Sequence, residues 1–200
     1  MKLSDIAQIM GGHPFRGAIL NEGHGAHVVQ MRNVDSSLGI QWDQCIQNNI
    51  RSKSNTRWLE VGDILLLARG NHNFPTYVSE TPETAIVSRE FHMIRVTAPQ
   101  IWKPEALAAY LSRGPFQVWL EQNITGTGNQ RYIKAAKLKE APIPEVGQDV
   151  QDELINLVHQ LTVQERLVRD LRNKVIGYSH QRMEHVNWRI SSEASNDDSE

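Results

Sequence analysis

Apolar residues follow a strict seven-residue pattern in the C-terminal part of the chain. The spacing alternates between four and three residues from Val150 to Tyr178, which is the heptad repeat of a coiled coil. At about 1.5 Å per residue, the pattern predicts one helix about 45 Å long, whose apolar seam cannot be buried against itself. The polar Gln164 within the seam is the kind of residue that fixes register or partner at some cost in stability. The seam positions are Val150, Leu154, Leu157, Leu161, Gln164, Val168, Leu171, Val175 and Tyr178.

A second apolar row accompanies this seam and indicates more than one contact surface. It consists of Ile155, Val158, Leu167 and Ile176. A helix packed on its own domain is the alternative to an interface with another chain. The helix follows a proline-marked exit and Gly147, as an appended element would, and this favours the interface.

The clearest strand lies in the segment Val61–Gly70. Its continuous apolar run indicates a strand buried on both faces, between a Gly62-Asp63 turn and Arg69-Gly70. Further strands are expected within Ala26–Asn33 and at three later segments, which together give a mixed sheet. The later segments are Phe74–Val78, Thr84–Val87 and Phe91–Val96. The polar segment 35–56 is expected to be irregular.

Short helices are predicted on both sides of these strands. Leu3, Ile6 and Ile9 have helical spacing, with Ser4 as the N-cap and Gly11-Gly12 as the end. Pro104 is expected at the first position of a second helix, which Gly114-Pro115 ends. A third short helix, around Phe116–Leu120, leads into a glycine-rich loop.

That loop, Thr125-Gly126-Thr127-Gly128-Asn129-Gln130, is the most distinctive polar segment. Arg131, Lys134, Lys137 and Lys139 follow, and no acidic residue occurs from Asn123 to Lys139. Small residues let a backbone approach a ligand closely, and positive charge suits a phosphate backbone. An ordinary surface loop would have a similar composition. The prolines of Ala141-Pro142-Ile143-Pro144 favour an extended exit.

Composition and charge narrow the class of protein. The net charge of −2 hides a mildly basic body, because the segment 191–200 holds four acidic residues and no basic one. No apolar run is long enough to span a membrane, and secretion is not expected, because the first residues lack the apolar core of a signal peptide. The single cysteine, Cys45, fits a reducing cytoplasm. His24 and His27 lack further ligands at metal-site spacing, so neither a metal nor another cofactor is expected.

The order of these parts is more informative than any one of them. The Leu3-Ser-Asp-Ile-Ala7 start, the Gly-Asp strand, the paired helices, the Thr-Gly loop, the Pro-Ile-Pro exit and the long helix come in succession. In this order the chain resembles a target recognition domain of a type I restriction-modification DNA specificity subunit, followed by its spacer helix. The resemblance implies an α/β (α+β) fold with a mixed-sheet recognition domain at 1–146 and a coiled-coil spacer helix at 147–189. The acidic, mostly polar composition of residues 190–200 predicts a disordered tail.

Subunits of this family usually hold two recognition domains joined by two antiparallel helices. One of each here implies a half-subunit form, which pairs as a homodimer or with another specificity half-subunit. The interface would lie along the long helix, at Leu154, Leu157, Leu161, Gln164, Val168, Leu171 and Val175.

The resemblance implies a cytoplasmic, sequence-specific reader of double-stranded DNA. It would direct a separate methyltransferase subunit, and a translocating nuclease subunit, to a bipartite target. The sequence has no methyltransferase motif, P-loop or paired nuclease carboxylates, so no catalysis is expected. The alternative is a self-associating coiled-coil module that binds protein. Candidate DNA contacts, chosen by loop position and chemistry, are Arg69, Asn71, Thr127, Asn129, Gln130 and Arg131, with Lys134 and Lys137 for phosphates.

Overall fold

The computed structural model describes residues 1–50, 56–70 and 73–183. The chain divides into two compact units, Met1–Thr162 and Val163–Glu200. The first unit combines β-sheets with short helices and the start of one long helix, and the predicted α+β class is confirmed. The expected acidic tail at 190–200 and the candidate residue Asn71 lie outside the described residues.

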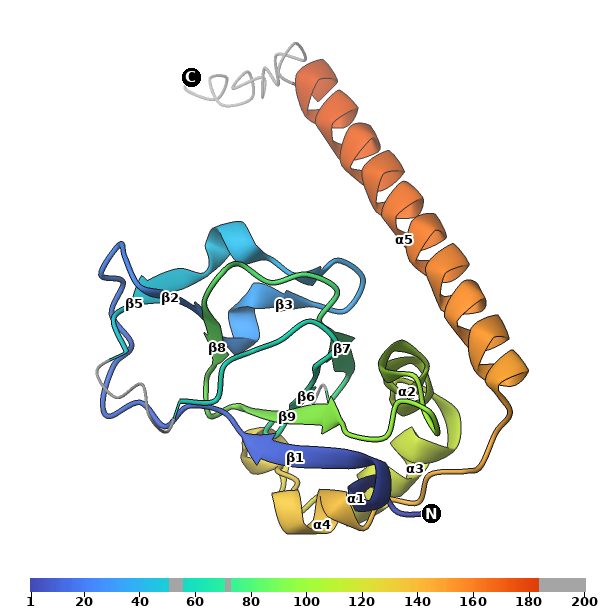
Figure 1. Cartoon of the computed structure of the whole chain (residues 1–200). Helices are drawn as coiled ribbons and strands as arrows, with labels where there is room; N and C mark the ends of the chain where they lie inside the picture. The colour runs from blue at the N-terminus through green and yellow to red at the C-terminus, as the bar shows by residue number, and fades with distance from the viewer. Residues whose placement is uncertain (51–55, 71–72, 184–200) are drawn as a thin grey trace, which may run out of the picture. The chain divides into compact units, whose positions relative to one another are not determined.

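A four-stranded antiparallel sheet forms the centre of the first unit (Figure 1). Its strands, in spatial order, are β1 (Ala7–Gly11), β9 (Phe91–Val96), β6 (Ile64–Leu67) and β7 (Pro75–Tyr77). Three of them, β6, β7 and β9, are strands that the apolar pattern predicts. β6 lies inside the sheet, so both of its edges are hydrogen-bonded to neighbours.

β6 is buried on both faces, as its unbroken apolar run predicts. Ile64 and Leu66 pack into a core shared with the helices. Leu65 and Leu67 point the other way, into a core shared with a second sheet. All four side chains are 6% exposed or less, so the strand carries apolar packing on both of its sides.

The second sheet is the mixed one. Its central strand runs parallel to one neighbour and antiparallel to the other, in the order β5 (Ile46–Asn48), β2 (Ala26–Val29) and β8 (Ala85–Val87). A short pair, β3 (Val34–Asp35) and β4 (Gly39–Ile40), lies nearby in the sequence, between the 3-10 helices η1 (Met31–Asn33) and η2 (Trp42–Gln44).

Two sequence predictions need correction in this region. The strand predicted to run through Met31 ends at Val29, because residues 31–33 turn into η1. The segment 35–56 is not wholly irregular, since β4 and β5 lie in it and Asn48 pairs with Ala26. Isolated apolar residues among polar ones conceal a short strand, because three residues are too few to show alternation.

The predicted N-terminal helix is wrong beyond its first turn. α1 covers only Leu3–Ile6, and residues 7–11 form β1, which pairs along the edge of β9. Lys2 rather than Ser4 is the N-cap, and the Lys2 backbone N–H donates to Asp5 Oδ2 at 2.7 Å. Ala7 and Ile9 fit a helical spacing, but they also alternate with the exposed Gln8, and the pairing offered by β9 decides for the strand.

Three further short helices complete the layer over the first core. They are α2 (Pro104–Leu111), α3 (Gly114–Asn123) and α4 (Ala135–Lys139). Pro104 occupies the start of α2, as predicted. Gly114-Pro115 does not end α2, however. The helix ends at Leu111, and Gly114-Pro115 forms the start of α3, where the missing N–H of the proline is not needed.

The proline-rich exit is extended and pairs with the chain start. The Leu3 N–H donates to Ala141 O, and the Ile143 N–H donates to Met1 O, both at 2.9 Å. The indole Nε1–H of Trp102 donates to Pro144 O at 3.1 Å. The exit is therefore anchored to the core, and the predicted extended conformation is confirmed.

The heptad region is one continuous helix, α5 (Gln148–Met183), of 36 residues. At about 1.5 Å per residue it is about 54 Å long. Residues 148–162 belong to the first unit and the remainder to the second. Among the described helices, none combines the length and apolar character that a membrane crossing requires.

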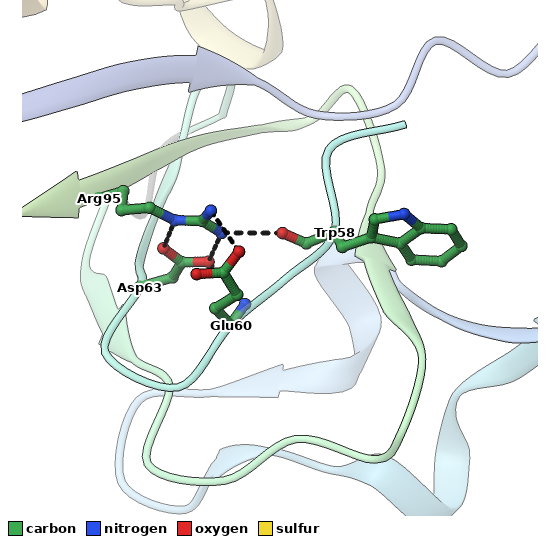
Figure 2. A network of polar contacts seen from close by, with 4 residues as sticks. All are labelled: Trp58, Glu60, Asp63 and Arg95. Carbon is green, nitrogen blue, oxygen red and sulfur yellow. Dashed lines mark hydrogen bonds and ion pairs between the residues drawn. The ribbon is translucent and has the colours of Figure 1, made fainter. Parts of the chain in front are cut away.

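A buried ion pair holds the turn before β6 (Figure 2). Gly62 has a φ of +95°, which favours glycine, and Asp63 follows with 1% exposure. Arg95 on β9 donates from Nε and Nη2 to the two Asp63 oxygens, each at 2.8 Å. The same guanidinium also donates to a Glu60 carboxylate oxygen and to the Trp58 carbonyl oxygen. Through Arg95, the Gly-Asp motif therefore anchors residues 58–63 to strand β9 of the sheet.

Candidate nucleic-acid interface

The glycine-rich loop is closed by its own pair of backbone hydrogen bonds. We call residues Thr125–Tyr132 the TG loop. The N–H of Thr125 donates to Tyr132 O at 2.9 Å, and the N–H of Tyr132 donates back to Thr125 O at 2.8 Å. Gly126 has a φ of +92°, and a Cβ placed there would lie 2.4 Å from Gln130 O, so only glycine fits. A short 3-10 turn, η3 (Gly128–Gln130), forms the tip.

The TG loop lies against the open end of β6. Arg69 and Tyr132 form an antiparallel bridge. The Gly70 N–H donates to Arg131 O, and the Ile133 N–H donates to Ala68 O, both at 3.0 Å. Two groups of candidate residues, separated by about sixty positions in the sequence, thus share one edge of the structure. The sequence predicts both groups, but it contains no signal that they meet.

Most of the candidate side chains in this region are open to solvent. Thr127, Gln130 and Arg69 are exposed, and Arg131 is partly exposed. Lys134 is the N-cap of α4, and Lys137 lies in its last turn, both exposed. Asn71 lies outside the described residues, and so does the Asn129 side chain. The described donors form an exposed polar edge followed by a short basic helix.

Arg131 has a partner that sequence reasoning missed. Its Nη2 forms an ion pair with Glu121 Oε2 on α3, and the two side chains are 25% and 56% exposed. An exposed ion pair of this kind contributes about 0.2–1 kcal/mol. A competing anion could therefore displace Glu121 from Arg131 with little loss of free energy. Without such an anion, the ion pair holds the Arg131 guanidinium beside the TG loop.

His92 is a second residue that sequence reasoning missed. It lies on β9 with 9% exposure, and its Nε2–H donates to Ile133 O at 2.8 Å. Because a carbonyl oxygen only accepts, Nε2 carries the proton, and the buried Nδ1 has no hydrogen-bond partner in the described structure. Burial lowers the pKa of His92 below its ordinary value of 6.5. A neutral imidazole on the central sheet thus anchors Ile133, the residue that directly follows the TG loop.

Several solved structures share this architecture, and three of them show the extent of the similarity. The S subunit of the type I restriction-modification system from M. genitalium aligns with a TM-score of 0.56 and 13% identity, over 92% of this chain and 43% of that one. The HsdS subunit from Thermoanaerobacter tengcongensis gives 0.59 and 15%, over 86% and 39%. A structure from a study of complex assembly and conformational transition of the type I R-M system gives 0.54 and 15%, over 90% and 42%.

The chain has the fold of a type I restriction-modification S subunit. No family model and no curated protein matches its sequence. The chain spans about two fifths of the length of each of these S-subunit structures. The predicted resemblance is confirmed at the level of the fold, and the roles of individual residues depend on the geometry of this chain.

The other reactive side chains that the structure describes offer neither a metal site nor an activated thiol. Among the described residues, no group of three His, Cys, Asp or Glu side chains is placed to hold a metal ion. His27 instead lies against Gln47, with 3.1 Å between the two Nε2 atoms. Burial raises the pKa of the Cys45 thiol to about 11, so the thiolate needed for nucleophilic chemistry is scarce at neutral pH.

Replacing His92 by phenylalanine should destabilise the fold and remove a pH dependence. The variant leaves Ile133 O buried without its donor, which costs about 1–3 kcal/mol. In the wild type, the depressed pKa means that the contribution of His92 is complete above about pH 6.5. It is lost as pH falls from there toward the folded-state pKa, because the unfolded chain binds the proton more readily.

Urea unfolding between pH 5 and 8 measures both effects. The control variant is His24→Phe, which replaces an exposed histidine. Its free energy of unfolding, and the dependence of that energy on pH that His92 causes, should match the wild type. A His92→Phe variant with unchanged stability and an unchanged profile would contradict the fastening role.

Proposed function

We propose that this chain is the DNA-recognition part of a type I restriction-modification S subunit. It binds double-stranded DNA sequence-specifically and directs a separate methyltransferase subunit, and through it the nuclease subunit, to the target. The observation that carries the proposal is the joined edge of β6 and the TG loop, which collects exposed hydrogen-bond donors on a fold shared with S subunits. The chain itself supplies binding, and the other subunits supply catalysis.

The chemistry of this edge suits a DNA groove. Guanidinium and amide groups are the side chains that read guanine and adenine edges in pairs of hydrogen bonds. In our proposal Arg69, Gln130 and Arg131 take that role, with Thr127 beside them. We propose the same role for Asn71 and Asn129, because they neighbour these residues in the sequence. Lys134 and Lys137, on the exposed side of α4, bind phosphates and so position the domain without reading bases.

The exposed seam of α5 supports a second part of the proposal. The apolar side chains of Val150, Leu157, Leu171 and Val175 are between 48% and 68% exposed. Such a row along one helix is the pattern of a coiled-coil interface. We propose that α5 pairs with the α5 of a second copy, through Leu154, Leu157, Leu161, Gln164, Val168, Leu171 and Val175, with a closed two-fold symmetry.

The same seam also favours a second candidate function. A self-associating module that binds protein would need the seam but would not need the exposed donors of the TG loop. DNA binding separates the two candidates, because phosphate contacts make affinity fall steeply with salt. A salt titration with a mixed-sequence duplex therefore tests the proposal: a log–log slope near zero would favour the protein-binding module.

Arg131 and its partner Glu121 provide the sharpest variants for this titration. Arg131→Ala should cost about 1–3 kcal/mol of binding to a selected target if Arg131 contacts a base edge bidentately. If it contacts a phosphate, the loss should be uniform over sequences and the salt slope should fall by about one. Glu121→Gln should have the opposite effect and tighten binding, because it releases the guanidinium and removes a negative charge.

Opposite changes in DNA affinity for the Arg131→Ala and Glu121→Gln variants distinguish a DNA contact from a structural role. If the ion pair served only the fold, both variants would lower stability together and change DNA affinity in the same direction. Unchanged affinity in both would remove Arg131 from the proposed interface.

A further inference from the structure

Gln151 is a fully buried polar side chain on a helix that is otherwise largely exposed. Its exposure is 0%, whereas Val150 before it and Asp152 after it are exposed. Its Oε1 accepts from the Lys103 N–H at 2.8 Å. Its Nε2 donates to Ile101 O at 2.8 Å and to Val146 O at 3.4 Å. Both ends of the carboxamide are therefore satisfied by backbone groups.

These backbone groups lie at the start of α2. Lys103 is the N-cap of α2, and its side chain makes no capping hydrogen bond. The Gln151 side chain instead accepts from the Lys103 N–H, one of the backbone N–H groups that have no partner within the helix. Ile101 lies two residues earlier. The side chain thus joins the first turns of α5 to one short segment of the recognition domain.

Neighbouring contacts join the same two elements. Gln148 Nε2 donates to Gln100 O at 3.1 Å, Lys103 pairs with Asp152, and Glu105 pairs with His159. Ile155 packs against the core that β6 shares with the helices. The polar side-chain pairs among these contacts lie near the surface, where even a charged pair contributes little, whereas an unsatisfied buried amide is costly. The buried Gln151 carboxamide is therefore the contact that specifies the arrangement.

These hydrogen bonds also fix the register of α5, that is, which residue of the helix faces the Ile101 and Lys103 backbone groups. A shift of α5 by one residue would place the apolar Val150 or the charged Asp152 against the Ile101 and Lys103 backbone groups, and neither side chain offers both a donor and an acceptor. Gln151 lies outside the heptad seam, so this contact leaves the seam positions available to another helix.

We propose that Gln151 is a positioning residue that fixes the register of α5 on the recognition domain and thereby restricts the separation of the two DNA half-sites. The proposal rests on the proposed function, in which two recognition domains are joined through their α5 helices. When both helices start from a single register on their domains, the domains can be spaced in only one way. Without the carboxamide, the helix start can slide or tilt, and several separations become possible.

The test compares two full-length variants of the same chemical change. Gln151→Met keeps the length of the side chain but removes its hydrogen bonds. Gln160→Met makes the same change at an exposed position of α5. Each protein and the wild type are used to capture duplexes from a random-sequence pool about four helical turns long, roughly 40 base pairs. Sequencing then gives the half-site motif and the distribution of separations between its two copies.

The wild type and Gln160→Met should enrich one motif pair at a single separation. Gln151→Met should enrich the same half-sites at two or more separations, with about a three- to tenfold weaker preference for the original one. A single, unchanged separation in Gln151→Met would overturn the inference. Failure of every protein to enrich any motif would overturn the proposed function instead.

Hydrogen exchange on the unsubstituted chain tests the inference without DNA and without a variant. The Lys103 amide should be protected about as strongly as the amides of the central strand β6. Rapid exchange at Lys103 would show that the carboxamide contact is not maintained, and would overturn the positioning role even if Gln151→Met proved unable to fold.

Discussion

Replacing Arg95 by methionine should lower the free energy of unfolding by about 3–5 kcal/mol, because it leaves a buried carboxylate without its counter-charge. Asp63 is 1% exposed, and its two oxygens accept both hydrogen bonds of the Arg95 fork. The variant also leaves the Trp58 carbonyl without a donor. Urea unfolding at neutral pH, followed by circular dichroism, measures the loss.

A matched variant and a double variant check the cause. Arg89→Met makes the same change at an exposed arginine and should alter stability by less than about 0.5 kcal/mol. Adding Asp63→Asn to Arg95→Met should restore part of the loss, because the uncompensated charge is then gone. If Arg95→Met costs no more than Arg89→Met, the pair does not hold the turn before β6.

Replacing Leu161 by aspartate should separate the proposed pair of chains. Leu161 is an apolar seam residue that is 36% exposed in the single chain, so a carboxylate there harms the interface more than the fold. Light scattering should show the mass halved while circular dichroism keeps most of the helical signal. The neighbouring Gln160→Asp, which lies outside the seam, should leave the mass unchanged.

The same variant should have a large effect on DNA binding. Two linked recognition domains gain about 10²–10⁴ in affinity over one, because the second contact becomes intramolecular. Leu161→Asp should lose that gain on a two-part target and keep the affinity for a single half-site. Unchanged mass and unchanged helicity would contradict the seam as an interface.

The sequence predicts the elements whose pattern is long or unbroken. The heptads identify α5, and the run of four apolar residues from Ile64 identifies β6 with both faces buried. The N-terminal segment is ambiguous in the sequence, because Leu3, Ile6 and Ile9 fit a helical spacing while Ala7 and Ile9 also fit a strand. Only the neighbouring β9, more than eighty residues away in the sequence, decides between them.

The candidate site could be predicted only in parts. Arg69 and the TG loop each stand out by composition, but their contact depends on hydrogen bonds between segments about sixty residues apart. His92 and Gln151 give a weaker signal, since each is a polar residue whose partner is a distant backbone group. A polar residue inside an apolar strand, as at His92, indicates that a partner exists and leaves its identity open.

The most direct test of DNA reading is to sequence the duplexes that the purified chain captures from a random pool, at low and at high salt. We predict enrichment of a bipartite palindrome whose two half-sites keep one fixed separation, with an unread spacer between them. Capture should weaken steeply as salt rises. A continuous or asymmetric motif would contradict the pairing of two copies through α5, and a pool that stays random at both salt concentrations would contradict the reading of DNA itself.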